Sequence, residues 1–160
     1  MKKSLFCVIF ILFLVSLSSC DLSYLSSGKE ALDHKNFEVT EGVYVNVCKK
    51  YNIVENTNLY VIENYNDYVK FCSDANLVID DILDEESYEK FFSKNVKVVN
   101  GRVAKDSLTE ASCAYGYDNS LRKIVGVYGF YVEDDRHKGK IEYNFDIIDV
   151  SRRMYKKMTK

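Results

Sequence analysis

The chain reads Asn-Val-Lys-Val-Val-Asn-Gly-Arg-Val-Ala over residues 95–104, and this segment indicates the kind of sheet that the protein forms. Val96 to Val99 (Val-Lys-Val-Val) is rich in valine, as is typical of a strand. Asn100-Gly101 follows it directly, and Asn-Gly between apolar runs is the dipeptide most typical of a two-residue hairpin turn. Because a hairpin joins antiparallel neighbours, the segment predicts an antiparallel sheet.

Further strands are expected on both sides of this segment, since their residues alternate between apolar and polar or are enriched in β-branched and aromatic types. Val43, Val45 and Val47 alternate with polar or larger residues, which predicts a half-buried strand over residues 42–48. The last expected strand has Tyr143 and Phe145 on one face and acidic or amide residues on the other. The expected strands span residues 42–48, 58–63, 96–99, 108–117, 123–132 and 141–147.

Two helices are expected between the second of these strands and residue 96. Asn64 with Asp67 three residues later forms an N-terminal cap signal, and Asp84 followed by Glu85 and Glu86 forms another. These helices are consecutive and do not alternate with strands. The pattern therefore predicts an α+β fold with an antiparallel sheet of five to seven strands and two consecutive helices inserted after the second strand.

The first twenty residues indicate export. Lys2 and Lys3 precede an apolar run from Leu5 to Leu17, and the segment closes on Ser18-Ser19-Cys20. A run of this length is typical of a signal peptide and is short for a membrane-spanning helix. Its end resembles the lipobox of bacterial lipoproteins, which implies cleavage by signal peptidase II between Ser19 and Cys20 and lipidation of Cys20. The resemblance thus implies a lipoprotein precursor anchored to the extracytoplasmic face of the cell membrane.

The rest of the chain has the size of one domain. We expect a signal peptide over residues 1–19, a lipidated cysteine with a flexible tether over 20–36, a single α+β domain over 37–150 and a basic C-terminal tail over 151–160. Residues 20–150 hold 24 acidic and 15 basic side chains, which argues against a nucleic-acid partner. The tail holds five basic side chains and no acidic one. It is interpreted as a solvated end, with contact to anionic lipid as the alternative.

A family resemblance covers about forty residues. The stretch from Val61 to Phe71 resembles a strand-then-helix element of small Clostridium-type lipoproteins, and the pattern from Asp84 to Val99 resembles a later element of the same family. The role of that family is largely unassigned. The resemblance therefore implies a fold and supplies no catalytic residue.

The sequence shows no motif of a hydrolase, phosphate-binding loop or metal site, and it predicts no cofactor. His34 and His137 are interpreted as solvated. The acidic clusters at 80–86 and 133–135 lack the spacing of a calcium loop and are interpreted as a helix start and a turn. Cys48, Cys72 and Cys113 allow at most one disulfide and are interpreted as buried thiols.

Thirteen tyrosines invite a comparison with sugar-binding surfaces, although packing within strands and helices explains most of them. Tyr115 and Tyr117, on either side of Gly116, are the pair that we single out as a candidate exposed ligand patch. The leading hypothesis is a non-enzymatic, lipid-anchored module that binds an envelope protein, a peptide or cell-wall material. The alternatives are an accessory subunit or inhibitor of an envelope protease or transporter and, more distantly, a hydrolase.

Overall fold

The computed structural model describes residues 29–55, 57–78, 84–104, 110–130 and 141–160. These residues form an α+β fold, as predicted, with seven strands and four helices. The strands belong to two antiparallel sheets, so the prediction of one sheet was wrong. The elements are β1 (Lys29–Leu32), β2 (His34–Val39), α2 (Glu41–Tyr51), β3 (Tyr60–Ile62), α3 (Tyr65–Asp74), α4 (Glu85–Lys94), β4 (Asn95–Ala104), β5 (Glu110–Asp118), β6 (Lys123–Phe130), β7 (Glu142–Ser151) and α5 (Arg152–Met158).

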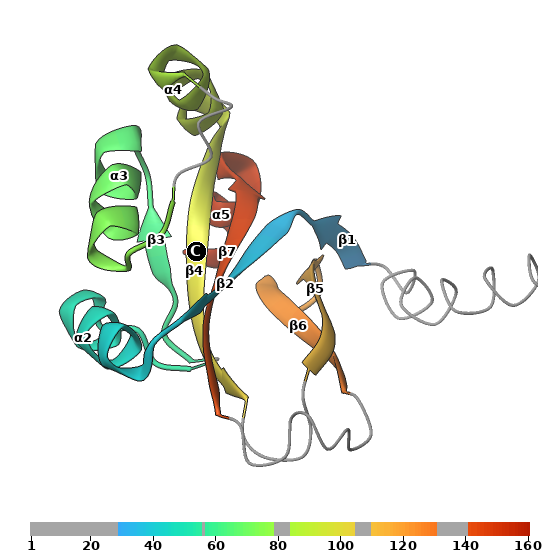
Figure 1. The fold of residues 1–160 in the computed structure, drawn as a ribbon. Helices are drawn as coiled ribbons and strands as arrows, with labels where there is room; N and C mark the ends of the chain where they lie inside the picture. The colour runs from blue at the N-terminus through green and yellow to red at the C-terminus, as the bar shows by residue number, and fades with distance from the viewer. Residues whose placement is uncertain (1–28, 56, 79–83, 105–109, 131–140) are drawn as a thin grey trace, which may run out of the picture.

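The larger sheet has the strand order β2-β7-β4-β3, and its centre is the pair β4 and β7. These two strands pair over ten residues, from Asn95 opposite Ser151 to Ala104 opposite Glu142. The smaller sheet has the order β1-β5-β6. Figure 1 shows β1 and β2 as consecutive arrows, so one stretch of chain passes from the smaller sheet into the larger.

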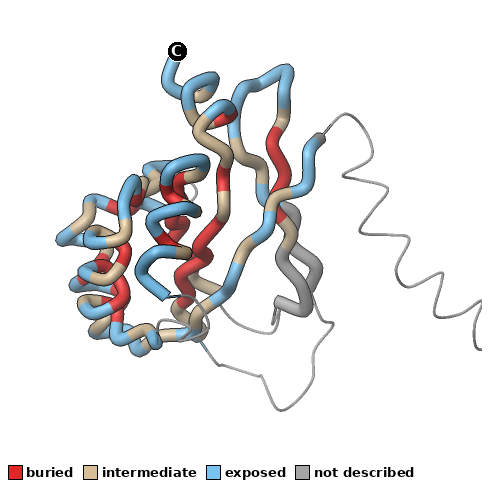
Figure 2. The backbone as a smooth tube through the Cα atoms, turned by 90° about the horizontal axis from the view of Figure 1, so that it is seen from above, coloured by how far each residue is buried: buried red, intermediate tan, exposed pale blue. Residues whose placement is uncertain are grey.

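The larger sheet is covered on both faces. Helices α2, α3 and α4 lie on one side of it, and the smaller sheet lies on the other (Figures 1 and 2). Phe71, Phe92 and Phe145 belong to the core on the helix side. Val98, Ile148 and Met154 of α5 belong to a second core on the opposite side, together with Tyr115 and Tyr117 of β5.

The predicted hairpin at Asn100-Gly101 was wrong, because β4 runs straight through this dipeptide. Asn100 pairs with Asp146 and Gly101 with Phe145 of β7. A side chain at position 101 would bring its Cβ within 3.0 Å of the Tyr44 hydroxyl and 3.1 Å of a methyl group of Ile53. The glycine therefore lets the layer of α2 approach the sheet closely.

The predicted strand over residues 42–48 was also wrong, because this segment lies within helix α2. Thr40 caps the helix, with its hydroxyl accepting from the backbone N–H of Val43 at 3.4 Å. Tyr44 and Val47 are its buried residues, while Val45 is 54% exposed. The valines alternate, but burial follows the three- and four-residue spacing of a helix, and tertiary packing overrides their strand propensity.

Two terminal predictions need correction as well. Residues 29–36 are not a flexible tether, since β1 pairs with β5 and β2 pairs with β7. Residues 152–158 of the basic tail form helix α5, and Met154 packs into the core at 8% exposure. The described fold thus extends beyond the expected domain of residues 37–150 at both ends.

Both predicted helix caps are confirmed. The Asn64 side chain accepts from the backbone N–H of Asp67 at 2.9 Å, and Asp84 accepts from that of Ser87 at 2.7 Å. The predicted strand pair across residues 118–120 is confirmed in β5 and β6. Among the described residues, the helices are too short or too polar for any of them to span a membrane.

Candidate binding groove

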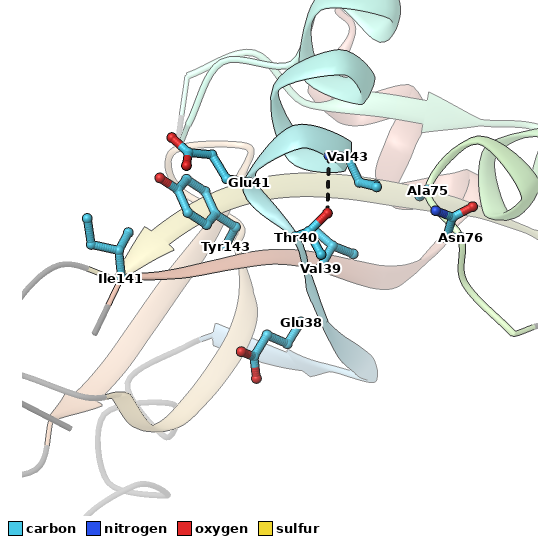
Figure 3. A pocket seen from close by; sticks show the side chains of 9 residues that line it. All are labelled: Glu38, Val39, Thr40, Glu41, Val43, Ala75, Asn76, Ile141 and Tyr143. Atoms are coloured by element: carbon cyan, nitrogen blue, oxygen red, sulfur yellow. Dashed lines mark hydrogen bonds between the residues drawn. The ribbon is translucent and has the colours of Figure 1, made fainter. Parts of the chain in front are cut away.

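An open groove of about 580 Å³ lies where β2 ends, α2 begins and β7 starts. Figure 3 shows its side chains, which come from three separate segments of the chain. Its apolar walls are Val39, Val43, Ala75 and Ile141. Polar groups complete the lining, and they belong to Glu38, Thr40, Glu41, Asn76 and Tyr143. The volume is in the range of small-molecule and peptide sites.

The first turn of α2 positions the polar side of the groove. Thr40 fixes where the helix begins, and Glu41 follows as its first residue. Figure 3 shows the Glu41 carboxylate beside the Tyr143 ring. A hydrogen bond to Glu41 raises the pKa of Tyr143 above its ordinary value, so the phenol stays protonated and donates to the carboxylate near neutral pH.

The groove has an acidic lining. Glu38 and Glu41 contribute carboxylates, and no described lysine or arginine lines it. Both side chains are exposed, and Figure 3 shows them on different sides of the chain, with Glu38 directed away from Tyr143. Such a surface favours cationic ligands over anionic ones.

Strand β2, which leads into the groove, is an edge strand of the larger sheet. The backbone N–H of Asp149 donates to the carbonyl of Asp33 at 2.8 Å. Because antiparallel pairs alternate, Lys35 and Phe37 also direct their backbone groups at β7, and those of His34 and Asn36 point to the outer edge. Among the described strands only β7 pairs with β2, which is the arrangement that strand addition by a peptide uses.

A second polar cluster lies buried between the two sheets. Asp146 is fully buried and accepts from Arg102 Nε at 3.0 Å, Tyr115 Oη at 2.7 Å and Asn36 Nδ2 at 2.6 Å. Asn100 Nδ2 donates to the Tyr115 hydroxyl at 3.1 Å. The cluster joins β2, β4, β5 and β7 and satisfies a buried charge, as a buried carboxylate requires. We assign it a structural role in holding the two sheets together.

The proposed tyrosine patch was wrong. Tyr115 is 3% exposed and Tyr117 is fully buried. Their side chains pack against Val98 and Ile148 in the core between the sheets. The larger sheet covers the face of β5 that carries both tyrosines, so their rings fill the interior and neither is exposed to a ligand.

The described thiols lie in the interior. Cys72 is buried and Cys48 is partly buried, and neither is in a disulfide. Burial raises the pKa of both thiols above the ordinary value. A catalytic thiolate needs a lowered pKa, so these two cysteines are poor nucleophiles.

His34 lies in β2, half-buried, with its ring 5.2 Å from that of Tyr115, so its interpretation as a solvated tether residue was wrong. Ser19, Cys20, His137, the acidic residues 133–135 and part of the acidic stretch 80–86 lie outside the described residues. The side chain of Cys113 also lies outside them. The described residues contain no group of three or more histidine, cysteine or acidic side chains placed to hold a metal ion.

The sequence interpretation missed every residue of the groove. The predicted tether ended at residue 36 and the predicted strand covered residues 42–48, so both the end of β2 and the start of α2 were missed. One local signal was present, because Thr40 followed by Glu41 is a common start of a helix. The approach of residues 75–76 and 141–143 depends on tertiary packing, and no local pattern indicates it.

Comparisons of the chain with models of protein families, with curated proteins and with solved structures find no match.

Proposed function

We propose that the protein is a lipid-anchored binding module on the extracytoplasmic face of the cell membrane, and that its groove holds an extended basic segment of an envelope protein. The observation that carries the proposal is the acidic groove beside the edge strand β2. Ile141 and Val43 offer apolar contact to one side of such a segment, and Glu41 offers charge.

Two features favour a peptide over a small molecule. The groove is open, and it continues into β2, where the backbone groups of His34 and Asn36 point to the outer edge. An extended peptide satisfies such groups by pairing as a further strand, while its alternate side chains enter the groove. Burial raises the pKa values of Cys48 and Cys72, which argues against these two thiols as nucleophiles of a thiol-dependent hydrolase.

The anchor rests on the lipobox-like segment Leu17-Ser18-Ser19-Cys20. It is tested by the intact mass of the membrane-extracted protein, with and without globomycin treatment of the cells. We expect a mature species that begins at Cys20 and carries acyl mass, and accumulation of the uncut precursor under the inhibitor. A soluble mature species without acyl mass contradicts the anchor and leaves the groove untouched.

The groove is tested with the mature chain carrying Cys20→Ser, which removes the site of acylation and keeps every described element. The probes are two synthetic peptides in which valine alternates with lysine or with glutamate, and binding is measured by fluorescence anisotropy. We expect the lysine peptide to bind and the glutamate peptide to bind far more weakly. Equal binding of the two contradicts the assignment of a basic segment.

Two matched pairs of variants locate the binding. Ile141→Ser alters the groove, while Val45→Ser alters a similarly exposed apolar residue outside it; the two are 49% and 54% exposed. Glu41→Gln and Glu85→Gln both alter the first residue of a helix, but only Glu41 lines the groove. We expect Glu41→Gln to weaken binding by up to about fivefold, the upper range for one exposed charge, Ile141→Ser to weaken it by loss of apolar contact, and each control to leave it unchanged. Equal effects of variant and control contradict the proposal.

A further inference from the structure

Helix α5 presents basic and apolar side chains on opposite faces. At 100° per residue, Arg153, Lys156 and Lys157 fall on one side of the helix, at the three- and four-residue spacing of a shared face. All three are exposed, and Lys160 continues the same spacing beyond the helix end. None of these four forms an ion pair with a described residue.

The opposite face of α5 fixes the helix to the fold. Met154 is buried, and Tyr155 and Met158 pack against the same core between the sheets. Arg152 turns away from the basic face and donates to the backbone carbonyls of Phe92 at 2.9 Å and Glu63 at 2.8 Å. The exposed charges therefore stand on a firmly packed element whose orientation the core determines.

Helix α5 and strand β1, at which the N-terminal segment joins the fold, pack against the same core. Leu32 of β1 packs against the same core as Met154 and Met158. Lys29 begins β1 opposite Asp118, and two exposed bases lie nearby in the chain, Arg122 in the turn after Asp118 and Lys123 at the start of β6. Cys20 lies nine residues before Lys29, a span of at most about 32 Å when fully extended.

We propose that the basic face of α5 is a contact site for anionic lipid headgroups, which turns the domain so that α5 faces the bilayer. The proposal rests on the proposed lipid anchor, which would hold the whole domain within reach of the membrane surface. Charge complementarity selects the occupant, since four exposed bases without a described ionic partner match the negative surface of phosphatidylglycerol or similar lipids.

This orientation complements the groove. Helices α5 and α2 pack on opposite faces of the larger sheet, because Met154 of α5 belongs to the core beside the smaller sheet and Tyr44 of α2 to the core on the helix side. A domain that rests on α5 keeps its acidic groove out of contact with the anionic surface, where a partner segment has access to it.

The test uses the mature chain with Cys20→Ser, so that any vesicle binding comes from the protein surface and not from an acyl chain. Binding to vesicles of phosphatidylcholine, with and without phosphatidylglycerol, is measured by co-sedimentation at rising salt. We expect binding only to the vesicles that contain phosphatidylglycerol, weakening as salt rises. No binding to those vesicles overturns the proposal.

A matched pair of triple variants locates the contact. Arg153→Gln/Lys156→Gln/Lys157→Gln removes the basic face, and Lys70→Gln/Lys90→Gln/Lys94→Gln removes the same charge from exposed positions on α3 and α4. Since one basic residue at the surface strengthens lipid binding about fivefold, we expect the first variant to bind about a hundredfold more weakly and the second nearly as the parent. If both triple variants bind the vesicles equally weakly, the attraction depends on net charge and not on the basic face of α5, and the proposal is overturned.

The two proposals fail separately. The α5 variant is also measured with the lysine peptide, and we expect it to bind that peptide as the parent does. Retained peptide binding with unaltered vesicle binding overturns the lipid contact alone. Loss of acyl mass in cells contradicts the anchor, whatever the vesicles show.

Discussion

The two faces of the larger sheet are both buried, but they are held by different chemistry. Phe145 and Asp146 are consecutive in β7, both are fully buried, and they point to opposite faces. Phe145 stacks on Tyr44 with ring centroids 5.2 Å apart, and Phe71 meets it edge-on at 5.7 Å. Asp146 instead holds three hydrogen-bond donors, from β2, β4 and β5.

This difference shows how one strand serves two cores. On the helix side, dispersion and apolar burial need only bulk and shape, and aromatic rings supply both. On the other side, the polar cluster gives directional bonds between β5 of the smaller sheet and β2, β4 and β7 of the larger one. A contact that depends on direction also selects how the two sheets are placed against each other.

The largest expected losses of stability come from truncating the side chain of Asp146 or that of Phe145. Asp146→Ala breaks the buried ion pair with Arg102 and removes the acceptor of three hydrogen bonds, so we expect a loss of about 3–5 kcal/mol in the free energy of unfolding. Phe145→Ala opens a cavity in the aromatic core, with an expected loss of about 3–5 kcal/mol. Urea unfolding of the mature chain with Cys20→Ser measures both.

The two losses should respond differently to a second substitution. Combining Asp146→Leu with Arg102→Met removes both charges, so we expect part of the stability to return. Adding Arg102→Met to Phe145→Ala fills no cavity and should give no recovery. If Asp146→Ala costs less than about 1 kcal/mol, the polar cluster does not carry the charge pairing assigned to it.

Substitutions of Gly101 and Gly42 are expected to change stability less, and the sign of the change depends on how closely other side chains approach each glycine. Gly101→Ala places a Cβ 3.0 Å from the Tyr44 hydroxyl and 3.1 Å from Ile53, so we expect a loss of about 1–3 kcal/mol from overpacking. Gly42→Ala, in the first turn of α2, meets nothing within 4 Å and should gain about 0.5–1 kcal/mol, since alanine favours helix. Thermal unfolding compares the two, and a neutral Gly101→Ala would contradict the close approach of α2 to β4.

Features that the sequence predicted correctly depend on residues close together in the chain. The caps at Asn64 and Asp84 each bond to a backbone N–H three residues later. In the turn after β5, the Asp118 side chain accepts from the backbone N–H groups of Ser120 and Leu121. Local patterns specify such contacts, because both partners lie within one turn.

The errors arose where distant residues decide the outcome. Asn36 bonds to Asp146 across 110 residues, and this pairing helps to make a strand of a segment that resembles a polar linker. Asn100-Gly101 has hairpin chemistry, but a ten-residue partner strand and the proximity of Tyr44 keep it extended. The tyrosines of β5 were expected at the surface because nothing in the sequence showed that a second sheet face would cover them.

The smallest expected effects distinguish two tyrosines within one strand. Tyr115 donates to Asp146 and accepts from Asn100, while the buried Tyr117 hydroxyl has no hydrogen-bond partner among the described residues. Tyr115→Phe deprives a buried carboxylate of a donor, so we expect a loss of about 1–2 kcal/mol. Tyr117→Phe removes an unsatisfied hydroxyl and should be neutral or slightly stabilising. Urea unfolding of the two variants isolates the hydroxyl from the ring, because both rings remain buried. No loss in Tyr115→Phe would mean that ring packing, and not the hydrogen bond to Asp146, is what Tyr115 contributes to holding β5 against the larger sheet.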